Sequence, residues 1–186
     1  KNDYGSTSAP QSVTLTTENY FEWNGQAGLL INSYGSITIA NLTANGNGDR
    51  GVGVFGAELN NAGGDQPMPV TLTGTNSFSG NGGCFCGPSG GGLRILSLGS
   101  ITLNNVQADS NTGSGAYGYG VYLDNQRLNA VGGVTINNAF NFLPSFSKNG
   151  NTGLYVLSFG NIMIKNIDAR ENGDLPGMGN GVYLDN

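Results

Sequence analysis

The sequence lacks histidine, which excludes a Ser-His-Asp triad, a Cys-His dyad and a histidine-ligated metal site within this stretch. Charge is also sparse, with 7 Lys and Arg against 12 Asp and Glu, a net charge of -5 and no basic run. Nucleic-acid binding needs Lys and Arg to neutralise phosphates, so this composition argues against it. No apolar run exceeds a few residues, which excludes a membrane-spanning segment.

Glycine is abundant instead, with 33 Gly in a chain of 186 residues. Asparagine is nearly as frequent, and the two types together make up close to a third of the chain. Hydrophobic residues still account for 37% and occur in short clusters such as those at positions 37–39 and 134–136. Disordered chains have too few apolar residues to form a core, so disorder is not indicated. The pattern predicts many short strands closed by Gly and Asn turns in one domain-sized unit.

Internal repeats determine the predicted fold. One family has the pattern Gly-Leu-x-Ile-x-Ser-x-Gly-Ser-Ile-Thr-Leu or close variants, at positions 28–39, 92–103 and 153–164. These starts give a double unit with a period of roughly 62 residues. A second, interleaved family has the pattern Gly-Val-Tyr-Leu-Asp-Asn at positions 120–125 and 181–186, and its first member is placed at positions 51–54. Coils are therefore predicted to begin near Gly28, Gly51, Gly92, Gly120, Gly153 and Gly181.

Alternation of apolar and polar residues within each segment predicts strands, and no stretch has a helical period. Strands that recur once per coil without an intervening helix predict an all-β, right-handed parallel β-helix solenoid. We expect about six coils in three double-coil repeats. Positions 1–186 would form a single segment, an excerpt of a longer repeat array.

Two columns of like residues are expected to run from coil to coil. Asparagine tolerates left-handed backbone geometry, and stacked amides can hydrogen-bond between coils. The asparagines expected at the turn after the second strand are Asn41, Asn105, Asn138 and Asn166. An aromatic column is expected from Phe21, Phe78 and Phe146, each three positions before an asparagine.

These two repeat patterns resemble the right-handed parallel β-helix repeats of bacterial surface and adhesin-like proteins, within the broad pectate-lyase-like superfamily. The resemblance covers essentially the whole chain. It implies a fold more than a function, because the same solenoid carries lyases, hydrolases, adhesins and inert stalks. Enzymes of this kind use clustered Asp and Glu, whereas Asp124 and Asp185 belong to the repeat itself and are expected to be solvated strand-end carboxylates. No catalytic residue and no cofactor is therefore predicted.

Two weaker site candidates remain. Asn45, Asn47 and Asp49 alternate oxygen-bearing side chains in a loop, but calcium requires more carboxylates than this loop offers, so a polar turn is favoured. Cys84 and Cys86 lack the ligand number of a closed metal site. We favour a local loop disulfide or two free thiols for this pair.

Outward-facing apolar side chains predict a contact face. Tyr122, Tyr155 and Tyr183 should form a column on the first strands, and apolar side chains should lie beside it, at Leu96, Leu98, Leu157 and Phe159. Large exposed apolar surfaces mark contact sites, and a tyrosine column could also stack on sugar rings. Plain like-on-like stacking explains the column equally well.

An outward threonine column is expected at Thr14, Thr38, Thr71, Thr102 and Thr135. Flat threonine arrays on solenoids can bind ice, but strand propensity explains the column more simply. The resulting hypothesis is a non-enzymatic, extracellular or cell-surface module that forms a stalk, fibre, filament or adhesin with copies of itself, with surface glycans as a further candidate partner. The alternative is a carbohydrate-binding or polysaccharide-active β-helix, and ice binding ranks third.

Overall fold

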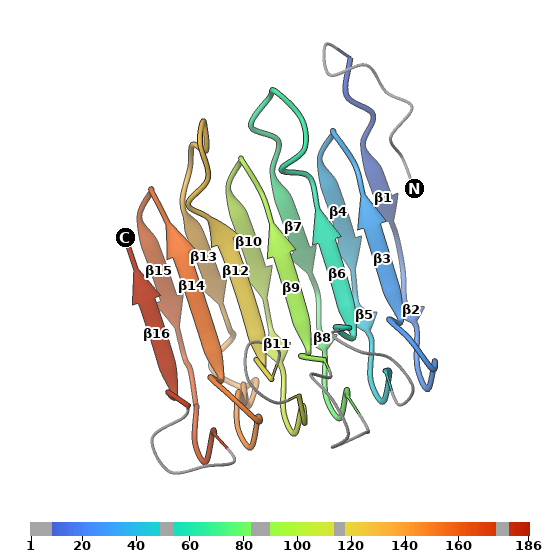
Figure 1. Ribbon diagram of the computed structural model, residues 1–186, viewed down its shortest axis with the longest axis vertical. Coiled ribbons are helices and arrows are strands. Elements are labelled where there is room, and N and C mark those ends of the chain that lie inside the picture. Colours follow the sequence, from blue (N-terminus) through green and yellow to red (C-terminus); the bar gives the residue numbers. More distant parts are fainter. Residues whose placement is uncertain (1–8, 49–53, 83–89, 114–117, 174–178) are drawn as a thin grey trace.

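The computed structural model describes residues 9–48, 54–82, 90–113, 118–173 and 179–186. In the described residues, each complete coil contains two strands of three to five residues, and a third strand of two residues is present in the coils up to Gln107. Each of these strands pairs in parallel with the equivalent strand of the next coil, as Figure 1 shows. The predicted all-β parallel solenoid is therefore confirmed, with no helix in the described residues, but it has about five turns where about six coils were expected.

Three sheets form the walls of the solenoid, and we name two of them by their outward residues. The tyrosine sheet contains β3 (Leu29–Asn32), β6 (Ala57–Asn60), β9 (Leu93–Leu96), β12 (Val121–Asn125), β14 (Leu154–Ser158) and β16 (Val182–Asp185). The threonine sheet contains β1 (Val13–Leu15), β4 (Ile37–Ala40), β7 (Val70–Thr73), β10 (Ile101–Asn104), β13 (Val134–Asn137) and β15 (Ile162–Lys165). The short sheet contains β2 (Asn19–Tyr20), β5 (Leu42–Thr43), β8 (Asn76–Ser77) and β11 (Val106–Gln107).

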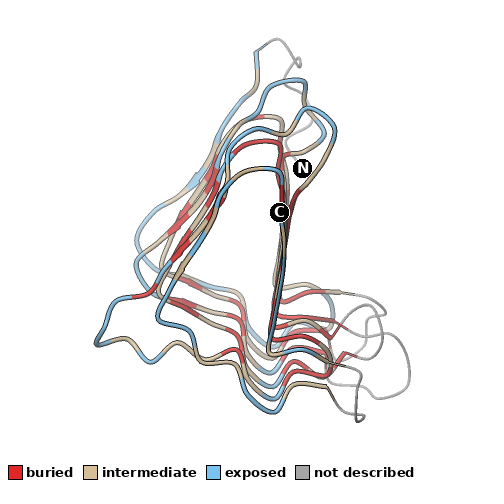
Figure 2. Ribbon diagram, turned by 90° about the vertical axis from the view of Figure 1, so that its left-hand side faces the viewer, coloured by how far each residue is buried: buried red, intermediate tan, exposed pale blue. Residues whose placement is uncertain are grey.

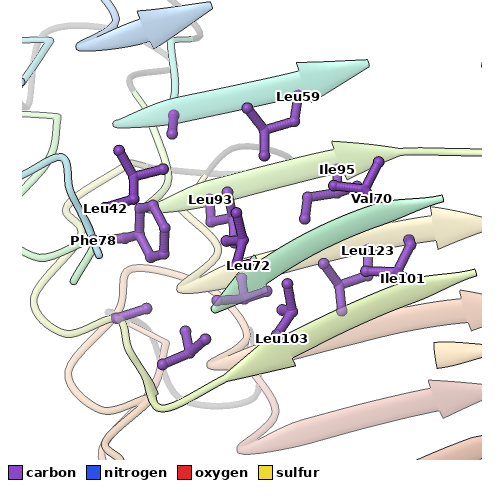
Figure 3. Packing of buried hydrophobic residues seen from close by; sticks show 14 of the residues in the cluster. Leu42, Leu59, Val70, Leu72, Phe78, Leu93, Ile95, Ile101, Leu103 and Leu123 are labelled. Atoms are coloured by element: carbon purple, nitrogen blue, oxygen red, sulfur yellow. The ribbon is translucent and has the colours of Figure 1, made fainter. Parts of the chain in front are cut away.

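Seen along the solenoid axis, the three walls form a triangle, and buried residues occur along each wall (Figure 2). Alternate residues of each strand point inward, so Val70 and Leu72 of β7 are fully buried while Thr71 between them is only half-buried. Figure 3 shows Phe78 lying between inward aliphatic residues such as Leu42 and Leu72. The walls are thus held by a continuous aliphatic core, not by a separate hydrophobic centre in each coil.

One predicted coil start is wrong. Leu29 pairs with Ala57, so the second coil begins its first strand after Gly56 and not after Gly51. Positions 51–53 lie outside the described residues, and Val54 is not in a strand. With this correction, the double-coil spacing is the same in both families, because Leu29 precedes Leu93 by as much as Ala57 precedes Val121.

The double-coil repeat has a counterpart in the core. The predicted phenylalanine column alternates with alanine: backbone bonds place Phe78 between Ala44 and Ala108, and Phe146 between Ala108 and Ala169. Both phenylalanines are fully buried, and so are Ala44 and Ala108. The alternation of large and small residues in this column therefore has the same period as the double-coil repeat of the sequence.

Buried asparagines form an unbroken column at the corner between the short and tyrosine sheets. In each pair the earlier residue donates its backbone N–H and its Nδ2 to the Oδ1 of the next, for example Asn81 to Asn111 at 3.1 and 3.0 Å. The same pattern joins the other coils. The column is Asn24, Asn47, Asn81, Asn111, Asn149 and Asn172. From sequence alone these residues fall into two separate sets, because they belong to two different repeat families.

Glycines pack directly against this asparagine column. A Cβ at Gly92 would lie 2.5 Å from the Phe78 carbonyl oxygen and 2.9 Å from the Asn111 amide nitrogen. A Cβ at Gly120 would meet Asn149 in the same way. The glycine that precedes each of these first strands is therefore required by close approach of the neighbouring chain.

The turn after the second strand also differs in part from the expectation. Asn41, Asn105 and Asn166 have positive φ values of 49°, 45° and 50°, the left-handed geometry that asparagine tolerates. Asn138 does not, and its side chain is buried with its Oδ1 accepting the Val106 N–H at 2.9 Å. Asn76 plays the equivalent role toward Leu42. Asn138 therefore satisfies the first N–H of a strand in the neighbouring coil instead of forming the turn itself.

Candidate functional site

The outward column of the tyrosine sheet combines aliphatic, charged and aromatic side chains. In register, it runs through Leu30, Glu58, Arg94, Tyr122, Tyr155 and Tyr183. We call this column the tyrosine face. Glu58 takes the outward position of the second coil, because that coil begins after Gly56 and not after Gly51.

The tyrosine rings of this face stack on one another. Tyr122 and Tyr155 have ring centroids 5.3 Å apart with an interplanar angle of 4°, and Tyr155 and Tyr183 are 4.5 Å apart at 8°. Parallel register causes this, because it sets equivalent side chains side by side on neighbouring strands. Both faces of the Tyr155 ring are consequently covered by other rings. A sugar could not stack on this ring, and only ring edges and hydroxyls face outward.

A fourth tyrosine joins the row from outside the strand. Tyr119 lies in the loop before β12, and its ring is 5.3 Å from Tyr122 and 5.2 Å from Tyr155, tilted by 57° and 58°. The repeat pattern does not select it. Its position two residues before the Val-Tyr-Leu segment is the only sequence signal that could have indicated it.

Arg94 ends the tyrosine row. Its guanidinium pairs with Glu58 at 3.1 Å, and its central carbon lies 6.0 Å from the Phe55 ring centroid and 5.9 Å from that of Tyr122. Cation–π contacts of this length add about 0.5–1 kcal/mol at exposed sites. The charge pair is therefore held against the aromatic row and is not an isolated surface ion pair.

Burial raises the pKa of the phenols in this row. It is the main cause of the raised pKa at Tyr122, with a smaller contribution from Asp124. Burial also raises the pKa of Tyr119 and Tyr155. These phenols therefore keep their protons to a higher pH than an ordinary tyrosine, because the charged phenolate is less well solvated there.

The predicted contact face is wrong at two residues. Leu96 and Leu98 are only 6% and 5% exposed, so neither can be an outer contact. The backbone N–H of Val131 bonds to the Leu98 carbonyl, which places the loop after β12 beside this turn. By contrast, Leu157 is half-buried, while Phe159 and Tyr183 are exposed.

Two loops present apolar side chains that the repeat pattern does not predict. Leu128 and Val131 are exposed in the loop between β12 and β13. Phe140 and Leu143 are exposed in the loop that follows β13. Neither loop belongs to the repeat pattern, so periodicity could not identify them.

The outward side of the threonine sheet is uniform. Thr14, Thr38, Thr71, Thr102 and Thr135 lie in one register column, which ends at Met163. We call this column the threonine face. Its strands carry no charged residue before Lys165 of β15. A shallow pocket at this end is lined by Thr135, Ile136, Asn137, Met163 and Lys165.

The calcium candidates do not converge on one point. The Asn45 Oδ1 accepts bonds from the Ser77 hydroxyl and the Ser79 N–H, whereas Asn47 is buried in the asparagine column. Asp49 lies outside the described residues, as do Cys84 and Cys86. Among the described residues no three His, Cys, Asp or Glu side chains gather as metal ligands.

Asp124 is not the solvated carboxylate that its place at a strand end suggested. It is 8% exposed, accepts the Gln126 N–H at 3.0 Å and pairs with Arg127 at 3.3 Å. These contacts close the turn after β12. Its strand partner Leu157 separates it from Asp185, so the two carboxylates lie two coils apart as expected.

The described part of the chain contains no helix long and apolar enough to cross a membrane. Comparison with protein-family models, curated proteins and solved structures finds no match to this chain.

Proposed function

We propose that this chain is a non-enzymatic structural repeat module of an extracellular or cell-surface stalk, fibre or adhesin. The observation that carries the proposal is the set of unbroken ladders. The asparagine column, the Phe/Ala column and the two long sheets each tie one coil to the next. Kinship with bacterial surface repeat arrays is part of the same proposal.

Ladders of this kind suit an elongated rod. Each coil contacts only its neighbours, so length is gained by adding coils without a new core, at about 4.8 Å per coil. Three described carboxylates serve local structure: Glu58 pairs with Arg94, Asp124 closes a turn and Asp109 accepts the Ser147 N–H. Such roles favour a scaffold over a hydrolase or lyase.

The module would join copies of itself laterally through exposed apolar side chains. Phe159 lies in the turn after β14, with 60% of its surface exposed. Phe140 is 96% exposed in a separate loop. Apolar groups left in water in this way are stabilised when a second surface covers them.

Sedimentation velocity over a range of protein concentrations, together with electron micrographs, tests this proposal. We expect concentration-dependent association that Phe159→Lys weakens and that Thr135→Lys, the matched change on the threonine face, leaves unchanged. A protein that stays monomeric at every concentration would overturn the self-assembly. Release of reducing ends from a polysaccharide, abolished by changing one carboxylate, would overturn the non-enzymatic role.

A carbohydrate-binding module is the second candidate, favoured by the row of tyrosine edges beside Arg94. Hydroxyls and a guanidinium are groups that hydrogen-bond sugars at a partly apolar surface. A glycan array with the native chain and Tyr155→Ala separates the two candidates. Binding that the variant loses favours the carbohydrate role, and no binding by either protein favours the scaffold.

A further inference from the structure

Four tyrosine rings lie within contact distance of one another on one wall of the solenoid. Tyr155 is their centre, with ring neighbours at 5.3, 4.5 and 5.2 Å in Tyr122, Tyr183 and Tyr119. Tyr20 and Tyr34, by contrast, lie against no other tyrosine ring among the described residues. The cluster is a local concentration of phenols, a side chain that one-electron oxidation readily couples.

Parallel register aligns the tyrosines of the stacked pairs with each other. Tyr122, Tyr155 and Tyr183 occupy equivalent positions of β12, β14 and β16. The interplanar angles of 4° and 8° show that this alignment extends to the ring planes. The ortho carbons of neighbouring phenols therefore lie on adjacent, nearly parallel ring planes.

We propose that Tyr155 and Tyr183 form a dityrosine cross-linking site, with Tyr122 and Tyr155 as the second coupling pair. The oxidant is a one-electron oxidant of the haem-peroxidase class supplied with hydrogen peroxide. Each phenol gives one electron to the oxidant and one proton to solvent, and becomes a phenoxyl radical. The two unpaired electrons pair as a carbon–carbon bond between one ortho carbon of each ring.

The step balances without a further reagent. Each coupled ring carbon loses its hydrogen as a proton, and the phenol oxygen regains a proton, so both rings become aromatic again. Two tyrosines have then lost two electrons and two protons in total, which reduce one hydrogen peroxide to two waters. Coupling requires rotation about the side-chain bonds, while the strands remain about 4.8 Å apart.

Tyr155 and Tyr183 are the favoured pair because their centroid distance of 4.5 Å is the shortest among the ring pairs of the described structure. The product would join two adjacent coils covalently. A cross-link of this kind constrains the unfolded chain in the way that a disulfide does.

The test treats the dilute monomeric protein with a haem peroxidase and hydrogen peroxide, then measures dityrosine fluorescence and maps cross-linked peptides by mass spectrometry. We expect an intramolecular peptide pair joining Tyr155 to Tyr183, lighter than the separate peptides by two hydrogen atoms. Tyr155→Phe keeps the ring stack but cannot form the phenoxyl radical, so we expect it to abolish that peptide pair and most of the fluorescence.

A double variant, Tyr20→Phe with Tyr34→Phe, is the matched control and should leave the Tyr155–Tyr183 product unchanged. Tyr183→Phe should shift coupling to Tyr122 and Tyr155. Products formed mainly between molecules, or a yield that Tyr155→Phe does not lower, would overturn the proposal. The reaction is measured in monomers, so its outcome does not depend on whether the chain assembles into fibres.

Discussion

The tyrosine and threonine faces are built on the same backbone geometry but behave as different surfaces. Both lie on six-stranded parallel sheets with aliphatic inward residues, such as Leu123 in one and Ile136 in the other. The threonine face repeats one short, uncharged side chain over five strands. The tyrosine face changes along the axis from an aliphatic residue through an ion pair to stacked rings.

The difference shows how the length of a side chain determines what it contacts in a parallel register. Parallel pairing places every outward residue beside its equivalent in the next coil, about 4.8 Å away. Threonine is short and stays within its own strand, so its column reflects strand propensity. Tyrosine and arginine reach across to the neighbouring coil, so their column becomes a set of coupled contacts. Long side chains on a repeat therefore contact one another between neighbouring coils.

The largest expected effect removes the interior that both faces share. Phe78→Ala leaves three consecutive alanines in the core column, with a void where the ring was, and should cost about 3–5 kcal/mol of unfolding free energy. Urea unfolding measures it. Phe140 is 96% exposed, so Phe140→Ala is the matched control and should stay within about 0.5 kcal/mol of the native chain. Similar losses in the two variants would contradict the assigned core.

Replacing a tyrosine by the residue of the other face tests the comparison directly. Tyr155→Thr removes two stacked ring contacts and should cost about 1–3 kcal/mol, since each aromatic pair contributes about 0.5–1.5 kcal/mol. Thr102→Ala on the threonine face should cost less than about 1 kcal/mol. Thermal unfolding of both variants measures the difference. Equal losses of unfolding free energy in the two variants would show that the stacking of the tyrosine rings adds no stability.

Alkaline pH should weaken the tyrosine face and leave the threonine face unchanged. Burial raises the pKa of Tyr122 and Tyr155 above the ordinary value of 10.0, so their protonated forms favour the folded state. That stabilisation is complete below pH 10.0 and is lost as the pH rises through the raised values. Unfolding measured on either side of this window should show a decline that Tyr122→Phe with Tyr155→Phe makes shallower. An unchanged decline would place its cause elsewhere.

The smallest expected effect concerns the ion pair that ends the tyrosine row. Glu58→Gln should cost about 0.2–1 kcal/mol at low salt, because the pair with Arg94 is partly exposed. High salt screens exposed charges, so the difference from the native chain should shrink in about 1 M salt, where the screening length falls to about 3 Å. Denaturant midpoints at low and high salt measure it. A loss that salt does not reduce would indicate packing rather than charge.

The strands can be predicted where the repeat is strong. The apolar-Thr-apolar pattern identifies Ile37–Ile39, Val70–Leu72 and Ile101–Leu103, and the structure places all three in the threonine sheet. Gly51 was wrongly predicted as a coil start, because the Gly-Val-Gly-Val segment at positions 51–54 has the apolar spacing expected of a first strand. The correct signal is Gly56-Ala-Glu-Leu-Asn-Asn, whose final asparagines match the Leu-Asp-Asn ending of the later coils.

Exposure could not be predicted from the strand pattern. Leu96 and Leu98 lie at outward or turn positions of the repeat, yet both are buried. Burial there depends on the course of the chain in neighbouring coils, such as the loop whose Val131 bonds to Leu98. Tyr119 could not be predicted for the same reason. It lies in a loop outside the repeat pattern, and its ring contacts Tyr122 and Tyr155 from there.

The sequence by itself determined the all-β parallel solenoid, because period-2 strands and a repeating Gly/Asn turn chemistry are local properties of the chain. Only the tertiary structure decided that the asparagines form one column, that phenylalanine alternates with alanine, and that four tyrosines meet on one wall. These features depend on which residues lie opposite each other in adjacent coils. The return loops differ in length, so spacing along the chain does not reveal that register.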